Sequence, residues 1–271
     1  LLQGLGSPNG LAVYDKINAE CIPHPFYLSG HPAWGDPEIH PWTTSRQMSY
    51  STEAMLWGTW IKVNLADQLP VSVAGLVMDN DFGLAYEMGF EAYAEQNPDV
   101  VEEYLPVRHD PAAPTLTNEV TTIAAFDPDV FISMTAGNPC LLAIQEVEAS
   151  GLYDRLSAAF TPSVCKGIAA YLAPAGMAAD GYWIVGGGAK DTTDSGKMDE
   201  PFIAFARDLI SDAGEDAGIS LTGEGVFRGY AFTEAFRIAD ALPGGMSRTN
   251  LMLALRNFKI YHPGLLDGLV T

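Results

Sequence analysis

Residues 71–99 read VSVAGLVMDNDFGLAYEMGFEAYAEQNPD, and this stretch decides the fold class. An apolar run at 71–78 ends in the polar residues 79–81, and a helical pattern follows at 83–96. A strand that stops at a polar loop and leads into a helix is half of a βαβ unit. Loops at the carboxyl ends of parallel strands are where open α/β sheets bind their ligands. The stretch therefore predicts a parallel sheet, and it raises the question of what lies beside Phe82.

The same alternation of strand and helix patterns continues along most of the chain. We expect a strand end at 1–5, further strands at 22–28, 100–107, 129–134, 157–162 and 181–187, and a long connection at 33–47. We expect helices at 11–21, 51–69, 116–126, 139–150, 200–212, 225–242 and 247–258. The helix at 51–69 is expected to bury Ala54, Leu56, Trp57, Trp60, Ile61 and Leu65. Such alternation is typical of α/β architecture with parallel sheets.

Composition excludes several classes of partner. The 271 residues are 48% hydrophobic, which is ample material for a folded core. The chain has 14 basic and 34 acidic residues, so its net charge is −20. A surface of this charge repels nucleic acid and anionic membranes. No apolar run is long enough to cross a bilayer.

The three cysteines, Cys21, Cys140 and Cys165, fit no zinc motif and form no CxxC pair. One disulfide with a thiol left over, or three buried thiols, are both compatible with the sequence. Cys165 beside Lys166 is also a candidate activated thiol. The acids at 79 and 81 are either a metal-binding pair or loop caps.

No catalytic constellation is found in the sequence. Of the five histidines, none has a second histidine four residues on, as zinc hydrolases require. There is no GxSxG elbow and no phosphate-binding GxxxxGK[ST] loop. The glycines at 186–188 follow a predicted strand but do not open a helix, so they lack the context of a dinucleotide-binding motif. We therefore expect a protein that is not an enzyme and uses no cofactor or metal.

Three segments of the chain carry a resemblance to a known family. They are VSVAGLVMDNDFGLAYEMGFEAYAEQNPDVVEEYLPVRHD, VTTIAAFDPDVFISMTAGNPCLLAIQEVEASGL and FRGYAFTEAFRIADALPGGMSRTNLMLALRNFK, in that order. Together they resemble the branched-chain amino acid binding proteins, of the leucine/isoleucine/valine-binding type. These are solute-binding components of ABC importers and have the type I periplasmic-binding fold.

The resemblance implies two α/β lobes with a ligand cleft between them. The first lobe would comprise residues 1–46 and 188–258, the second residues 47–187, and residues 259–271 would cross toward the second lobe. Family members carry further strands and helices before the position of Leu1, and they usually continue past the last residues. The resemblance therefore implies a chain truncated at both ends.

In the first lobe, the resemblance places ligand contacts on loops at strand ends. Ser7 matches a serine that commonly holds a ligand carboxylate. Ser29, Gly30 and His31 match the next loop, where the family usually has threonine in place of His31. An imidazole can still donate to a carboxylate, although a loop histidine beside a proline is often only surface. Phe227 is a candidate apolar wall of the site, with packing in the helix core as the alternative.

In the second lobe, Phe82 matches the aromatic residue, often tyrosine, that covers the ligand. The alternative is that Phe82 packs under its own helix. Thr135 and Ala136 match the next ligand loop. The segment 162–165, which includes Cys165, falls where the family often places an acid for the ligand's ammonium group. No acid stands there, which disfavours an α-amino acid and leaves other small carboxylates open, because an unpaired buried ammonium is costly.

The function implied is that of an extracytoplasmic solute-binding protein. It would take a small carboxylate or an amino acid and deliver it to ABC permease subunits. A ligand-sensing domain of a receptor or regulator with the same fold is the alternative. An α/β enzyme with its nucleophile outside this chain is the third reading.

Overall fold

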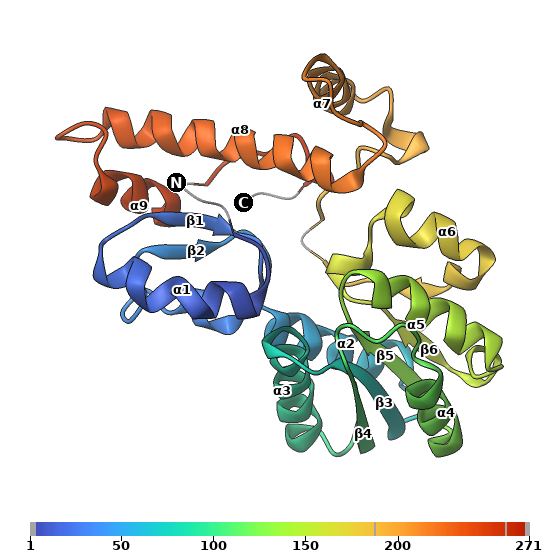
Figure 1. Ribbon diagram of the computed structural model, residues 1–271. Helices are drawn as coiled ribbons and strands as arrows, with labels where there is room; N and C mark the ends of the chain where they lie inside the picture. Colours follow the sequence, from blue (N-terminus) through green and yellow to red (C-terminus); the bar gives the residue numbers. More distant parts are fainter. Residues whose placement is uncertain (1–3, 187, 258, 269–271) are drawn as a thin grey trace. The chain divides into compact units, whose positions relative to one another are not determined.

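The computed structural model describes residues 4–186, 188–257 and 259–268. The chain divides into two compact units, each with parallel strands and helices (Figure 1). The first unit comprises Leu1–Gln47, Gly167–Ala170 and Gly187–Thr271, and the second comprises Met48–Lys166 and Tyr171–Gly186.

A five-stranded parallel sheet forms the centre of the second unit, with the strand order β4-β3-β5-β6-β7. The strands are β3 (Val71–Met78), β4 (Val101–His109), β5 (Val130–Met134), β6 (Ala158–Phe160) and β7 (Tyr182–Trp183). Every residue of β3 except Ser72 is buried. A parallel strand covered on both faces has this continuous apolar character.

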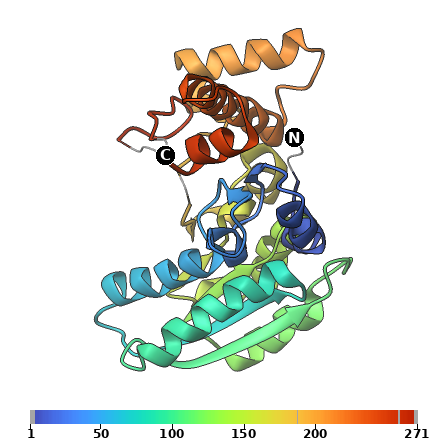
Figure 2. The same ribbon diagram turned by 90° about the vertical axis from the view of Figure 1, so that its left-hand side faces the viewer.

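Helices cover both faces of this sheet (Figures 1 and 2). Val73 and Val77 of β3 pack with α2 (Tyr50–Asn64) and α3 (Asp81–Gln96), while Ala74 and Leu76 pack with α4 (Thr117–Phe126) and α5 (Asn138–Ala149) on the other face. Successive side chains of a strand point to opposite faces, so one strand contributes to both cores. The second unit is therefore a three-layer α/β domain.

The order of the strands fixes where this sheet can bind a ligand. β3 lies between β4 and β5, so the chain first adds a strand on one side of β3 and then continues on the other side. The loops that leave β3 and β5 at their carboxyl ends consequently diverge. Open α/β sheets bind ligands in the crevice at such a switch point.

The first unit contains a two-stranded parallel sheet, β1 (His24–Tyr27) and β2 (Thr43–Ser45). Leu5 extends this sheet by a bridge to Leu28, directly before α1 (Ser7–Ala19). The long helix α8 (Ser220–Ala241) and α9 (Arg248–Asn257) bury Phe26 of β1. The remaining elements are α6 (Ala173–Ala175), α7 (Pro201–Asp212), a π-helical turn at Ile168–Leu172 and 3-10 turns at Pro32–Gly35, Tyr153–Arg155, Ser163–Cys165, Gly176–Ala179 and Ser195–Lys197.

Several expected bounds differ from the observed ones. The helix expected at 11–21 begins at Ser7, because Pro8 fits the first turn, where its missing N–H leaves no bond unmade. β2 lies inside the segment 33–47, which was expected to be only a connection. The strand expected at 181–187 covers only two residues, and α8 begins at Ser220.

Two further observations concern the buried face of α2 and the placement of residues 259–268. Leu56 of α2 is 37% exposed, so it does not belong to the buried face of that helix. Residues 259–268 group with the first unit, whereas a crossover toward the second lobe was expected. The expected elements at 1–3, 187, 258 and 269–271 lie outside the described residues.

Candidate functional site

The loop after β3 is short because its backbone turns directly into α3. The side chain of Asn80 accepts hydrogen bonds from the backbone N–H groups of Phe82 (2.9 Å) and Gly83 (3.3 Å) and so caps the helix. A Cβ atom on Gly83 would overlap the backbone carbonyl of Met78. Only glycine allows the helix to begin this close to the end of the strand.

Phe82 points into the core of its own unit. It is 6% exposed, and its ring centre lies 4.8 Å from that of Tyr50 and 5.3 Å from that of Tyr86. Ala136, in the loop after β5, packs against the same core. Phe82 and Ala136, two of the expected contact residues of the second unit, therefore share one apolar cluster at the switch point of the sheet.

Thr135 directly follows β5, and its side chain is fully buried. Its hydroxyl pairs with that of Ser133 at 2.9 Å. The neighbouring Gly137 has a φ of +68°, which favours glycine, and it is exposed directly before α5. The exposed part of this loop is therefore its backbone at Gly137, while the threonine side chain holds the loop from inside.

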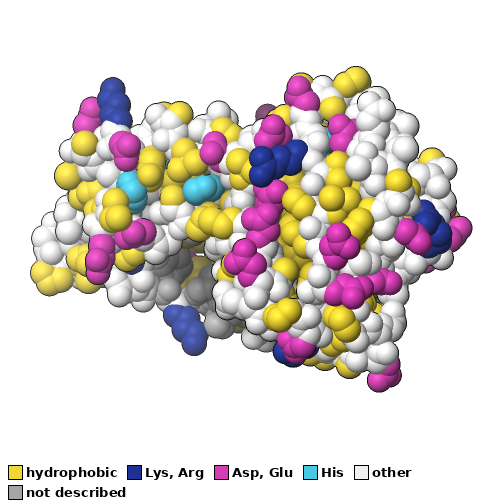
Figure 3. Space-filling view, turned by 90° about the horizontal axis from the view of Figure 1, so that it is seen from below, with side chains coloured by type: hydrophobic (Ala, Val, Ile, Leu, Met, Phe, Trp, Pro, Cys, Tyr) yellow, Lys and Arg dark blue, Asp and Glu magenta, His cyan; other side chains and the backbone are white. Residues whose placement is uncertain are grey.

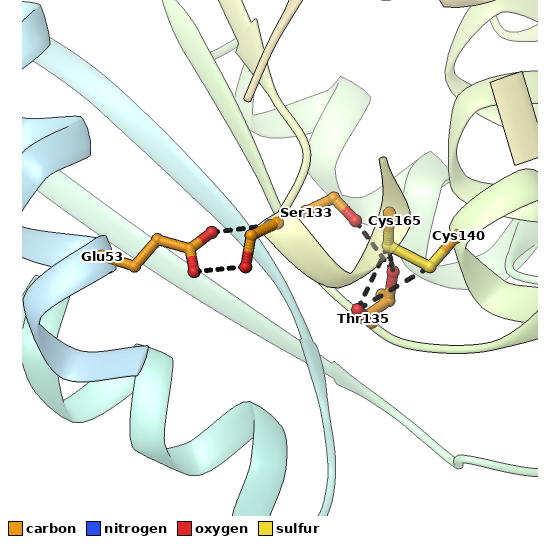
Figure 4. Close-up of a disulfide and its surroundings, with 6 residues drawn as sticks. Glu53, Ser133, Thr135, Cys140 and Cys165 are labelled. Carbon is orange, nitrogen blue, oxygen red and sulfur yellow. Dashed lines mark hydrogen bonds between the residues drawn. A yellow bond between two sulfur atoms is a disulfide. The ribbon is translucent and has the colours of Figure 1, made fainter. Parts of the chain in front are cut away.

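A disulfide joins Cys140 of α5 to Cys165 in the loop after β6 (Figure 4). Thr135 lies beside it, with its carbonyl oxygen 3.4 Å from the sulfur of Cys165. Because Cys165 is oxidised and its side chain is fully buried, it is no activated thiol. The bond resolves the alternatives left open for the cysteines, and Cys21 remains as an exposed free thiol.

An acid does reach the loop after β6, but it comes from α2. Glu53 is fully buried and accepts hydrogen bonds from the backbone N–H (2.6 Å) and the hydroxyl (2.7 Å) of Ser163, and from the hydroxyl of Tyr86 (2.9 Å). Burial raises the pKa of the Glu53 carboxyl to about 7, against the opposing effect of these hydrogen bonds. Sequence reasoning missed this residue, although a glutamate on the apolar face of a helix is itself a signal.

Serine hydroxyls meet at the carboxyl edge of the sheet in the first unit. The Ser7 and Ser29 hydroxyl oxygens lie 2.9 Å apart, and both side chains are buried. The hydroxyl of Ser29 also accepts the backbone N–H of His31 at 3.1 Å, and that of Ser45 donates to the carbonyl of Ser29 at 2.6 Å. The structure thus brings together the loops that follow Leu5, β1 and β2.

His31 caps the 3-10 turn that follows it. Its Nδ1 accepts the backbone N–H of Ala33 at 3.2 Å, so this nitrogen carries no proton. Any proton of the neutral ring is consequently on Nε2, which is the nitrogen that can donate to a carboxylate. Gly30, between Ser29 and His31, is buried.

Phe227 packs in a separate small core of the first unit. Its side chain is fully buried in a small core with Ile203 and Ala206, and its ring centre lies 5.8 Å from that of His262. This is the helix-core packing weighed above as the alternative to a ligand wall.

Acidic side chains are much more frequent than basic ones on the face that Figure 3 shows.

Among the described residues, no group of three or more His, Cys, Asp or Glu side chains is placed to hold a metal ion. Asp79 lies 4.0 Å from Arg108, so it has an ion-pair partner within its own unit. No helix in the described part of the chain is long and apolar enough to cross a membrane.

Comparisons with known proteins agree with this architecture. The profile of the family described as "Periplasmic binding protein" matches residues 1–269. None of the curated proteins compared matches the chain.

Three solved structures illustrate the likeness in fold. The fatty acid ABC transporter substrate-binding protein from Thermomonospora curvata has 17% identity and a TM-score of 0.76, over 96% of this chain and 64% of that one. A branched chain amino acid ABC transporter from Thermus thermophilus with bound valine has 17% identity and a TM-score of 0.76, over 96% and 66%. The solute binding protein of an ABC transporter from Rhodopseudomonas palustris HaA2, in complex with p-hydroxybenzoic acid, has 15% identity and a TM-score of 0.71, over 97% and 68%. The present chain thus spans less than two thirds of the first of these proteins.

Proposed function

The chain belongs to the periplasmic binding protein family, and from this premise we propose that it is the solute-binding component of an ABC importer. Its solute is a small organic acid, and its partners are the permease subunits that receive this solute. The loops at the carboxyl edge of the sheet in the first unit supply contacts to this solute.

The pairing of Ser7 with Ser29 carries this proposal. Residues separated by 22 positions place their hydroxyls 2.9 Å apart at the carboxyl edge of one sheet. The backbone N–H of His31 holds the same hydroxyl of Ser29. Short donors at the ends of parallel strands are the usual means by which α/β proteins orient a small ligand.

The chemistry of similar proteins supports a carboxylate as the common group. The names of three of them refer to a fatty acid, to valine and to p-hydroxybenzoic acid, all of which carry a carboxylate. In this chain Glu53 is an acid that reaches the loop after β6, and its oxygens are bonded to Ser163 and Tyr86. This arrangement favours an acid without an ammonium group, because a buried ammonium requires a carboxylate of its own.

The disulfide supports a location outside the cytoplasm. Disulfides persist in oxidising compartments and are rare in the cytosol, where thiols are kept reduced. The bond between Cys140 of α5 and Cys165 in the loop after β6 is therefore what an extracytoplasmic location would preserve.

A thermal-shift screen tests the proposal. Refolded, ligand-free protein is heated with valine, 4-hydroxybenzoate or octanoate, and in parallel with the corresponding amides. Binding to the native state alone raises the melting temperature. We expect one acid to raise it in proportion to the logarithm of its concentration, while its amide has no effect. No shift with any acid, or equal shifts with acid and amide, would contradict the proposal.

A further inference from the structure

Two arginines of the first unit converge on a single carboxylate oxygen. Nη1 of Arg46 lies 3.3 Å and Nη2 of Arg228 lies 3.1 Å from Oε2 of Glu224. The three side chains are only 18%, 10% and 17% exposed. Glu224 and Arg228 stand one turn apart on α8, and Arg46 directly follows β2. The cluster is thus largely buried and held by two elements far apart in sequence.

The charges of this cluster do not balance. In the described part of this unit, Glu224 is the one carboxylate that forms an ion pair with either arginine, which leaves one excess positive charge. The imbalance occurs in a chain with 34 acidic and only 14 basic residues. A buried charge without a counter-ion is costly, because the protein interior replaces its hydration poorly.

The neighbouring histidine, His262, adds no charge to the cluster. Nδ1 of His262 accepts the backbone N–H of Gly264 at 3.0 Å, and Nε2 lies 2.7 Å from the carbonyl of Phe227, to which it donates. The ring is therefore neutral. Burial lowers the pKa of His262, and the positive charge of Arg46 lowers it further.

Arg228 also has a donor without an acceptor. Its Nε–H is buried and makes no hydrogen bond within the described part of the chain. Buried donors are almost always paired in folded proteins, so an unpaired one indicates that a further group belongs at this position. An acceptor with negative charge would satisfy this donor and the charge balance together.

The cluster lies at the edge where the candidate site lies. Ser45, the last residue of β2, donates its hydroxyl to the carbonyl of Ser29, and the next residue is Arg46. The serine pair at Ser7 and Ser29 carries no charge, so the arginines are the cationic part of this edge.

We propose that Arg46 and Arg228 form an anion subsite of the first unit and that this subsite takes the carboxylate of the solute. The assignment rests on the function proposed above. A carboxylate has one negative charge and two acceptor oxygens, which match the excess charge and the donors of two guanidinium groups. The subsite restricts the solute to anions, and the loops of Ser7 and Ser29 supply further contacts at the same edge of the sheet.

Calorimetric titration with 4-hydroxybenzoate and 4-hydroxybenzamide tests the subsite in the full chain. Arg46→Gln and Arg228→Gln should each weaken binding of the acid about 10- to 100-fold, as expected for the loss of a charged hydrogen bond. Arg228→Lys, which keeps the charge, should recover part of the loss. Arg237→Gln is the matched control, because Arg237 lies on the same helix with a side chain that is 71% exposed. Wild-type affinity in Arg228→Gln would overturn the subsite and leave the proposed function intact.

Iodide locates the subsite independently of any solute. Crystals grown in sodium iodide should show an anomalous peak between the two guanidinium groups, and this peak should be absent in Arg228→Gln. If the wild type binds the iodide there but none of the organic acids, the subsite stands and the proposed function fails. No iodide between Arg46 and Arg228 in wild-type crystals would overturn the subsite, even if the protein binds an acid elsewhere. Melting temperatures of all variants verify that each is folded.

Discussion

The carboxyl group of Glu53 connects α2 to the loop after β6 within the second unit. It is fully buried and accepts three hydrogen bonds, two of them from Ser163. Burial raises its pKa from 4.5 to about 7. A carboxyl group with this pKa changes its charge close to neutral pH, which makes the stability of this unit sensitive to pH.

The sign of that dependence follows from proton binding. Between pH 4.5 and about 7, Glu53 is protonated in the folded state but largely ionised in the unfolded state. The contribution of Glu53 to the free energy of unfolding should therefore be greatest below pH 4.5. This contribution should decrease by up to about 3 kcal/mol as the pH rises from 4.5 through about 7.

Glu53→Gln tests this assignment, because glutamine has the same shape and does not titrate. Urea unfolding from pH 4.5 to 8 should show the decrease in the wild type and a flatter profile in the variant. Glu102→Gln, at an exposed position of β4, is the control and should keep the wild-type profile. Identical profiles for wild type and Glu53→Gln would show that Glu53 does not titrate in this range.

Gly83 is required by the close approach of α3 to the end of β3. A methyl group there would overlap the backbone of Met78, which cannot move without breaking the strand. We expect Gly83→Ala to reduce the free energy of unfolding by about 1–3 kcal/mol or more. Gly225→Ala is the control on α8, where a Cβ meets no atom within 4 Å, and it should be neutral or stabilising by up to about 1 kcal/mol. Equal stabilities of the two variants would contradict the close approach.

At the scale of elements, the disulfide links the start of α5 to the loop after β6. The two cysteines are 25 residues apart in sequence. Replacing both by serine should lower the free energy of unfolding by about 2–4 kcal/mol, because the unfolded chain regains the freedom of that loop. Cys21→Ser, at the exposed free cysteine, should have no effect. A thiol assay should find one reactive thiol in the denatured wild type and three after reduction; three before reduction would contradict the bond.

The elements that sequence predicted well are those with local patterns. β3 is a continuous apolar run and α3 has an asparagine cap at its start, so both are encoded within residues 71–96. β2 was missed because Thr43, Thr44 and Ser45 show no apolar pattern. It is a strand only because it pairs with β1, and such a partner cannot be read from three residues.

The candidate site divides in the same way. The family resemblance assigned Ser7, Ser29 and His31 to ligand loops of one lobe, and hydrogen bonds join these residues in the structure. Their contact with a ligand stays a prediction. Glu53 and the pair of Arg46 and Arg228 were missed, because their roles depend on residues more than 100 positions away, Ser163 for Glu53 and Glu224 for Arg46. Sequence alone shows a glutamate or an arginine but not whether it is buried with a partner.

At the scale of the whole molecule, a chain of net charge −20 is proposed to bind an anion. Long-range repulsion opposes this, so local positive charge must be placed where the anion binds. The arginines at the carboxyl edge of the first unit provide it. The proposed recognition of the acid thus depends on two largely buried arginines, Arg46 and Arg228, in a protein whose surface is mainly acidic.

The position of a bound acid tests the account most directly. Crystals of the protein grown with 4-bromobenzoate give an anomalous signal from bromine, and the electron density of the attached carboxylate shows which residues it contacts. We predict that the carboxylate lies at the carboxyl edge of the sheet in the first unit, within hydrogen-bonding distance of Arg228. A carboxylate bound at another surface, such as the groove lined by Trp42, Met252 and Leu253, or no bound acid at saturating concentration, would contradict the account.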